Sequence, residues 1–251
     1  MGSFARALMP TFPIFALTLL HFSHGRAIRV VGAIALLPVA FAGIYLIDPV
    51  NTARIFLSDI FQEFITPTIL PLATLILATG ALGDEVDDRT MVYLVLKPVS
   101  RLRIVLEKYA AVVTATVLVL WIGLLLTWIL SGRSDLFDGT DVLLAGLIAI
   151  LWGVLAYGAV FMTVSLLVPR ALMVGIVYIL LWETLLSRLI PGARVLSLRH
   201  YVNSIFARIV NDPRISVDDS FQLYSAVAVL LVVIALTTFF TTSRLRSMDL
   251  E

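Results

Sequence analysis

The residues best suited to chemistry lie in the charged stretch 84–108, which separates two long apolar segments. This stretch contains five acidic and five basic side chains. Four of the acids, Asp84, Glu85, Asp87 and Asp88, could hold a divalent cation or serve as the acid pair of a membrane-embedded enzyme. No histidine-containing partner motif follows them in an apolar segment. A docking element is therefore a better interpretation of the stretch than an enzyme site.

The lysines of this stretch do not form a nucleotide-binding loop. A P-loop has a glycine directly before its lysine, and glycine precedes neither Lys97 nor Lys108. The chain also has no cysteine, which excludes disulfides, iron–sulfur sites and thiol catalysis. We therefore expect no cofactor in this chain.

Three other side chains deserve a functional test. His21 and His24 could offer two ligands to a metal, but no third ligand lies near them in sequence, so we predict no metal site. Glu183 is the only carboxylate inside a predicted span, and an isolated charge is costly in lipid. It is therefore a candidate intramembrane functional residue. The alternative is that Glu183 lies near the outer end of its span, paired with Arg188 or hydrated by the outer loop.

Membrane-spanning helices must position these side chains. The chain is 60% hydrophobic and 14% charged, with a mean hydropathy of +1.03, whereas soluble proteins have about 25% charged residues. Its apolar runs are continuous and do not alternate, which favours helices over barrel strands. We predict an all-α integral membrane protein, one transmembrane domain over 1–251 with six helices. The spans are expected at 30–47, 65–83, 109–130, 142–168, 171–187 and 221–243.

Two further helices are expected outside the spans. Residues 11–26 are apolar but too short to span, so we predict an N-terminal interfacial elbow helix, with a seventh irregular span as the alternative. Residues 194–210 place apolar side chains every three to four positions, which predicts an amphipathic helix on the outer membrane face within the loop 188–220. The segment 48–64 is expected to be an outer loop. A tight turn at Pro169 and Arg170 should separate the fourth and fifth spans.

The charged stretch itself predicts a helix, a bend and a second helix. Asp84 can cap the first helix, and Lys97 precedes Pro98, which ends it. Ser100 is placed to cap the next helix, whose first turn carries Arg101.

The distribution of basic residues predicts the orientation. Most of the 18 basic residues fall on the cytoplasmic side if both termini are cytoplasmic. We therefore predict a multi-pass protein of the cell membrane with the stretch 84–108 in the cytoplasm. The net charge of +1 gives no indication of a nucleic-acid partner, and none is expected.

The charged stretch resembles the signature of type 2 ABC exporter permeases. In that family an acid, a Gly-Thr pair, an apolar run ending in Pro-Val-Ser-Arg and a Leu-Gly-Lys triplet follow one another. Here the matching residues are Glu85, Arg89-Thr90, LVLKPVSR (94–101) and VLEK (105–108). The order of helices along the whole chain is also similar. The chain departs from the pattern at Arg89 and Glu107, where the family usually has glycine.

The resemblance implies that this stretch is a coupling helix seated in a groove of a cytoplasmic ABC ATPase subunit. The residues implied in coupling are Asp84, Glu85, Thr90, Lys97, Pro98, Ser100, Arg101 and Lys108. ATP and Mg²⁺ would then bind the partner ATPase, and a second permease chain, identical or different, would complete the transporter in the bilayer.

The implied function is export of an unidentified substrate. The Pro-Val-Ser-Arg version of the motif is most similar to the branch that includes permeases for copper-enzyme maturation and gliding motility. Delivery of a maturation factor is therefore an alternative to drug or lipid export. A membrane-embedded scaffold or sensor, and a membrane enzyme that uses the acids at 84–88, are the alternatives from other classes.

Overall fold

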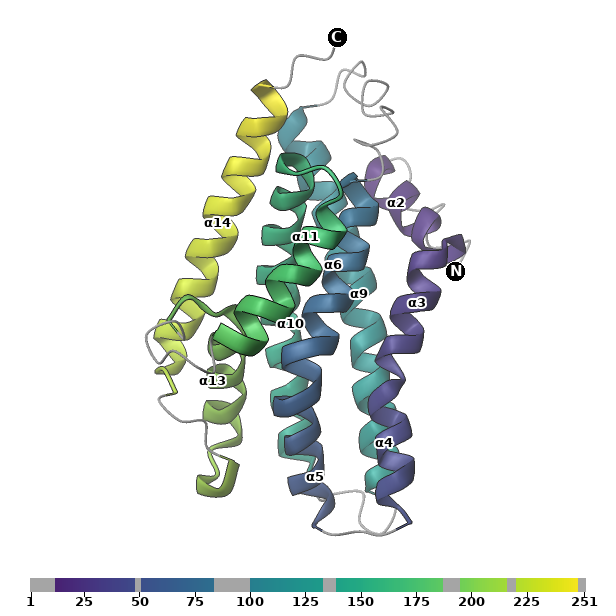
Figure 1. Ribbon diagram of the computed structural model, residues 1–251, viewed down its shortest axis with the longest axis vertical. Helices are drawn as coiled ribbons and strands as arrows, with labels where there is room; N and C mark the ends of the chain where they lie inside the picture. Colours follow the sequence, from purple (N-terminus) through teal and green to yellow (C-terminus); the bar gives the residue numbers. More distant parts are fainter. Residues whose placement is uncertain are drawn as a thin grey trace.

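The computed structural model describes residues 12–47, 51–83, 100–132, 139–186, 195–215 and 220–247. Within these ranges nearly every residue is helical and no strand occurs (Figure 1). Five of the described helices are long and apolar enough to cross a membrane. They cover Arg26–Tyr45, Ala53–Leu82, Arg101–Ser131, Thr140–Leu167 and Leu223–Leu245. The prediction of an all-helical membrane protein is confirmed.

The chain enters the bundle through a sharp corner. Helix α2 (Pro13–His24) starts with proline, whose missing N–H costs nothing in a first turn. Gly25 is extended and separates α2 from α3 (Arg26–Ala35), which continues into α4 (Leu37–Tyr45). A helix in the predicted elbow segment is thus confirmed, and its place at the membrane surface stays a prediction.

The second span begins earlier than predicted. It runs without a break through α5 (Ala53–Ile60), η1 (Phe61–Ile69), α6 (Leu70–Ala78) and η2 (Thr79–Gly83). The expected outer loop 48–64 is therefore wrong from residue 53 onward. At 30 residues the span is about 45 Å long, which exceeds the ~30 Å hydrocarbon core. Its charged first turns can consequently lie beyond the lipid tails.

Wide π-helical turns surround the proline in the middle of this span. Pro67 has no N–H and its ring crowds the preceding turn, so the helix widens over η1. The hydroxyl of Thr66 donates to the carbonyl oxygens of Phe61 at 2.9 Å and of Gln62 at 3.1 Å. The side chain thereby supplies a donor beside the proline.

The third and fourth spans are α9 (Arg101–Ser131) and α10 (Thr140–Leu167). Helix α9 starts eight residues before the predicted 109, because Ser100 caps it at Arg101. After Pro169, Arg170 adopts the left-handed conformation at φ 58°, which confirms the predicted tight turn. Helix α11 (Ala171–Tyr178) and η3 (Ile179–Leu186) follow. This fifth predicted span, 171–187, is shorter than the five helices named above.

The last part of the chain contains α13 (Leu198–Val210), η5 (Pro213–Ile215) and α14 (Leu223–Ser247). The predicted helix within 194–210 is confirmed, and Asn211 ends it in the left-handed conformation. Most of α13 is buried against α10, α14 and η1, so it packs into the bundle, and its expected place at the outer membrane face stays a prediction. The buried side chains of α13 include the polar Arg199 and Asn203 beside the apolar ones.

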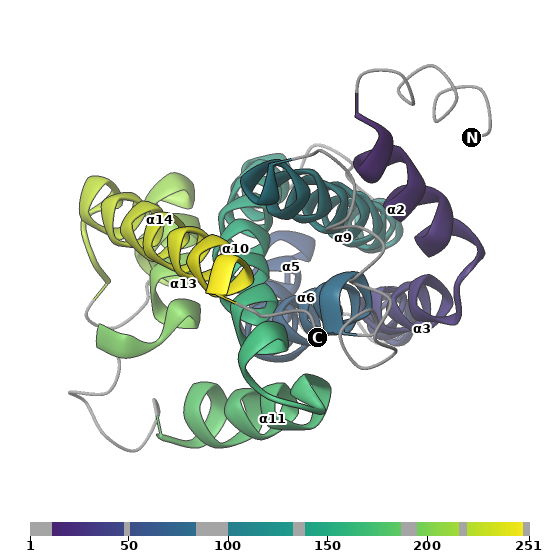
Figure 2. The ribbon, with the colours of Figure 1, turned by 90° about the horizontal axis from the view of Figure 1, so that it is seen from above.

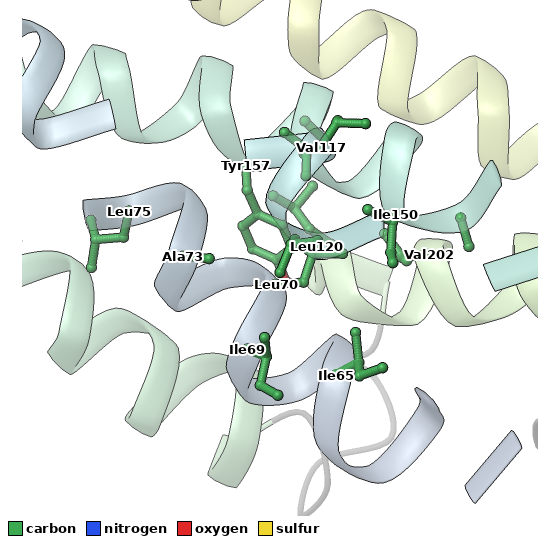
Figure 3. Close-up of a cluster of buried hydrophobic side chains, with 14 of the residues drawn as sticks. Ile65, Ile69, Leu70, Ala73, Leu75, Val117, Leu120, Ile150, Tyr157 and Val202 are labelled. Carbon is green, nitrogen blue, oxygen red and sulfur yellow. The ribbon is translucent and has the colours of Figure 1, made fainter. Parts of the chain in front are cut away.

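Helix α10 is at the centre of the bundle. It packs against α14, α13, α9 and α6 (Figure 2). The buried apolar core lies between α10 and these neighbours, where Leu70, Leu120, Ile150, Tyr157 and Val202 come together (Figure 3).

One glycine allows an unusually close helix contact. A Cβ atom on Gly123 of α9 would lie 2.4 Å from the carbonyl oxygen of Ala35 in α3. Only glycine fits there, as is common where membrane helices pack backbone to backbone.

Candidate coupling site

The site is built on the first two turns of the third span, Ser100–Lys108, which we name the α9 base. Ser100 has an extended backbone, and its Oγ accepts a hydrogen bond from the N–H of Arg103 at 3.4 Å. A serine in this position satisfies one of the unpaired N–H groups at a helix start. The predicted capping role of Ser100 is confirmed, so the helix begins within the motif, directly after Ser100.

Arg101 connects the α9 base to the last span. Its Nη1 donates to the carbonyl oxygen of Leu245, near the end of α14. Helices end in unpaired carbonyls with a partial negative charge, so a guanidinium is favourable there. Arg101 therefore fixes the end of α14 beside the start of α9.

Lys108 connects the α9 base to the second span. The side chain is 1% exposed, and its Nζ donates to the carbonyl oxygen of Ala81 in η2 at 2.6 Å. A buried ammonium group is tolerated only when it is well hydrogen-bonded. Lys108 thus holds the end of the second span against α9.

Glu107 connects the α9 base to α2. The side chain is 5% exposed, and one carboxylate oxygen accepts from the backbone N–H groups of Ile14 at 2.9 Å and Phe15 at 3.1 Å. The other oxygen accepts from Nε of Arg103 at 2.6 Å. The first turn of α2 has no acid of its own, so Glu107 supplies the negative charge that a helix start favours.

Sequence reasoning missed the role of Glu107, which entered only as a departure from the permease motif. One signal was present: Glu107 follows Arg103 by four positions, a spacing at which helical side chains meet. The hydrogen bonds that Glu107 accepts from α2 could not be predicted from the sequence, because Phe15 and Ile14 lie 92 and 93 positions away.

The α9 base therefore contacts three other elements by side-chain hydrogen bonds. Arg101, Glu107 and Lys108 reach α14, α2 and η2 respectively. Figure 1 shows the ends of α6 and α14 at the same upper end of the molecule as α2. Of the predicted coupling residues, Asp84, Glu85, Thr90, Lys97 and Pro98 lie outside the described residues. The helix, bend and helix expected over 84–99 stay a prediction.

Glu183, the intramembrane candidate, is buried and binds a helix start. Its carboxylate accepts from the hydroxyl of Ser197 at 2.5 Å and from the N–H groups of Leu198 at 3.1 Å and Arg199 at 3.4 Å. Tyr178 donates a fourth hydrogen bond at 3.1 Å. These contacts give Glu183 a structural role, because it anchors the first turn of α13 to η3.

An ionic cluster that the sequence did not suggest joins three segments at the lower end of Figure 1. Arg54 pairs with Asp141 at 2.5 Å and also with Asp212. The backbone N–H of Arg214 and the guanidinium of Arg54 lower the pKa of Asp212. Arg54, close to the start of the second span, is tolerated because two acids neutralise it.

Arg199 of α13 reaches the widened turn of the second span. Its Nη2 donates at 3.3 Å to the carbonyl oxygen of Gln62, the same oxygen that accepts from Thr66. The wide turn at Pro67 thus provides an acceptor for α13.

The two histidines of α2 are exposed, and His24 bonds through Nδ1 to the carbonyl oxygen of Leu20 at 3.1 Å. Within the described ranges, no three potential metal ligands of the His, Cys, Asp and Glu types come together.

The fold and this site define a class: a multi-pass helical membrane protein in which charged side chains of the α9 base connect several helices by hydrogen bonds. The chain belongs to the ABC-2 transporter family, since residues 20–184 match the family model described as "ABC-2 family transporter protein". Members of the family are membrane subunits of ABC transporters that associate with an ABC ATPase. No curated protein shows detectable similarity to the chain.

Proposed function

We propose that this chain is the permease subunit of an ABC exporter and couples ATP hydrolysis in a separate cytoplasmic subunit to movement of its spans. ATP and Mg²⁺ bind the ATPase, both termini face the cytoplasm of the cell membrane, and a second permease chain completes the path for the substrate. Export of the substrate follows from alternating closure of the two permeases.

The observation that carries the proposal is the set of connections at the α9 base. Residues 84–99 lead directly into Ser100, so displacement of that stretch by an ATPase pulls on α9. Lys108 would pass the movement to the second span and Arg101 to the last span. Hydrogen bonds to charged groups contribute about 1.5 to 3 kcal/mol each, which suffices to move these ends together.

The test is purification of the tagged chain from its native membrane in mild detergent, followed by mass spectrometry and an ATPase assay. We expect an ATP-binding-cassette subunit, a second permease in stoichiometric amount, and vanadate-sensitive ATP turnover. An intact, monodisperse chain that recovers no such subunit would contradict the proposal and favour a scaffold, a sensor or an enzyme.

Variants of Arg101 refine this test. Arg101→Glu places a negative charge against the carbonyl of Leu245, and we expect weaker recovery of the ATPase subunit or ATP turnover that no longer depends on the permease. The matched control is Arg208→Glu, since Arg208 also donates to backbone carbonyls but lies on α13, where it bonds to Ser220 and Phe221. Equal effects of both substitutions would refute a specific coupling role for Arg101.

A further inference from the structure

The first span carries one continuous exposed stripe. Along α3 and α4 the exposed side chains recur every three to four positions, and only 22% of this span is buried, so one face of the helix has no neighbour among the described residues. The large apolar members of the stripe are Val30, Leu36, Leu37, Phe41, Ile44 and Ile47. In a membrane protein such a face contacts lipid tails.

The stripe ends in charge at the corner between α2 and α3. Arg26 and Arg29 are exposed on the same stripe, Arg26 one turn before Val30 and Arg29 directly before it. His21 and His24, in the last turn of α2, are exposed on the other side of Gly25. We name these four residues the elbow patch. Figure 2 shows the corner between α2 and α3 at the periphery of the bundle, away from α10.

No described carboxylate neutralises the elbow patch. Glu107 is bound to the first turn of α2, and Glu183 to the first turn of α13. The remaining described acids lie in other segments: Asp59 in α5, Glu63 in η1, Asp141 in the first turn of α10 and Asp212 after α13. Arg26 and Arg29 are exposed, and no described acid is paired with them.

We propose that the elbow patch binds the headgroups of anionic phospholipids. The first span has 20 residues, a length of about 30 Å that matches the hydrocarbon core, so its first residue lies at headgroup level. The apolar stripe places lipid tails directly beside the arginines. A lipid fits this arrangement better than a protein, because one molecule satisfies both the charge of Arg26 and Arg29 and the apolar surface that follows them.

The electrostatic contribution of the two arginines is large enough to distinguish between lipid headgroups. Each cationic side chain near an anionic surface contributes about 1 kcal/mol, so the two arginines amount to roughly a 30-fold preference for an anionic over a zwitterionic headgroup at low ionic strength. The preference falls as salt screens the charges.

Native mass spectrometry of the full chain tests the proposal. The detergent-solubilised protein is titrated with dioleoyl phosphatidylglycerol and, separately, with dioleoyl phosphatidylcholine. We expect the wild type to retain the phosphatidylglycerol preferentially and the double variant Arg26→Gln/Arg29→Gln to lose most of this preference. Unchanged retention by the double variant would overturn the proposal.

Two controls separate the patch from general charge and from misfolding. Arg170→Asn removes another exposed arginine and suits the left-handed backbone there, so it should leave lipid retention unchanged. Arg26→Lys/Arg29→Lys should restore the preference. An equal loss in Arg170→Asn, or no rescue by lysine, would refute a built headgroup site. The assay needs no ATPase, so its failure is distinct from failure of the proposed coupling.

Discussion

Two helices outside the long spans are held in the same way, one at the edge of the bundle and one inside it. Glu107 accepts hydrogen bonds from the first turn of α2, which lies at the upper end of Figure 1, and Glu183 accepts them from the first turn of α13. In each case a buried carboxylate of another segment binds the positive end of a short helix. Both contacts are polar anchors, but the surroundings differ.

Packing separates the two helices. Helix α13 lies among α10, α14 and η1, and most of its side chains are buried. Helix α2 packs against α9 and α3 at the edge, and beside its start lies an apolar groove of about 690 Å³ lined by Phe12, Phe15 and Leu106, among others. The hydrogen bonds to Glu183 therefore add to a dense core around α13, whereas the hydrogen bonds to Glu107 are a principal constraint on the position of α2. A coupling element would therefore move α2 more readily than α13.

The largest effect should come from the packing of α13. Phe206 is fully buried and stacks on Phe61, with ring centroids 4.2 Å apart. We expect Phe206→Ala to cost about 3 to 5 kcal/mol, measured as a lower thermal unfolding temperature in detergent. Leu17→Ala on α2, where the side chain is 52% exposed, should change little. Similar losses in the two variants would break the comparison.

Loss of the anchor of α13 should have the next largest effect. Glu183→Ala leaves the N–H groups of Leu198 and Arg199 without this acceptor, and each unsatisfied buried group costs about 1 to 3 kcal/mol. We expect a loss of about 3 kcal/mol in the same unfolding assay. Asp59→Ala is the matched control, because Asp59 is exposed and lies in α5, away from the residues that Glu183 binds. A stable Glu183→Ala variant would contradict the structural role.

Loss of the anchor of α2 should act locally. Glu107→Ala removes the acceptor for the N–H groups of Ile14 and Phe15, so we expect their hydrogen exchange to accelerate about tenfold. Hydrogen exchange read by mass spectrometry measures this directly. Glu107→Gln keeps one acceptor oxygen and should give a smaller change. Equal protection of α2 in the wild type and in Glu107→Ala would show that packing alone holds the helix.

The smallest effect concerns how the ionic cluster around Arg54 stabilises the fold at low pH. The pKa of Asp212 is lowered in the folded state, so its contribution is present above its unfolded pKa of about 3.9 and is lost as pH falls through the lower folded pKa. We expect the unfolding temperature to fall between about pH 5 and pH 3, and Asp212→Asn to reduce this dependence. Glu63→Gln should retain it. An identical pH profile for Asp212→Asn would exclude a contribution from the pair with Arg54.

Several local features could be predicted because they depend on near neighbours. The Pro169–Arg170 turn follows from proline geometry, and the Ser100 cap from one side chain beside a helix start. The start of the second span could not be predicted in this way. The sequence predicts a loop at Arg54 because of its charge. In the structure Arg54 is helical, and Asp141 and Asp212, 87 and 158 positions away, neutralise it.

Composition and apolar run length alone determined that this is a helical membrane protein, because lipid admits few ways to satisfy the backbone. The sequence motif likewise indicated the family before any helix was placed. The tertiary structure decided what the charged residues do: Glu107 and Glu183 became anchors for helix starts, and α13 became part of the core. These outcomes depend on which distant segments meet in space, and no local pattern records that.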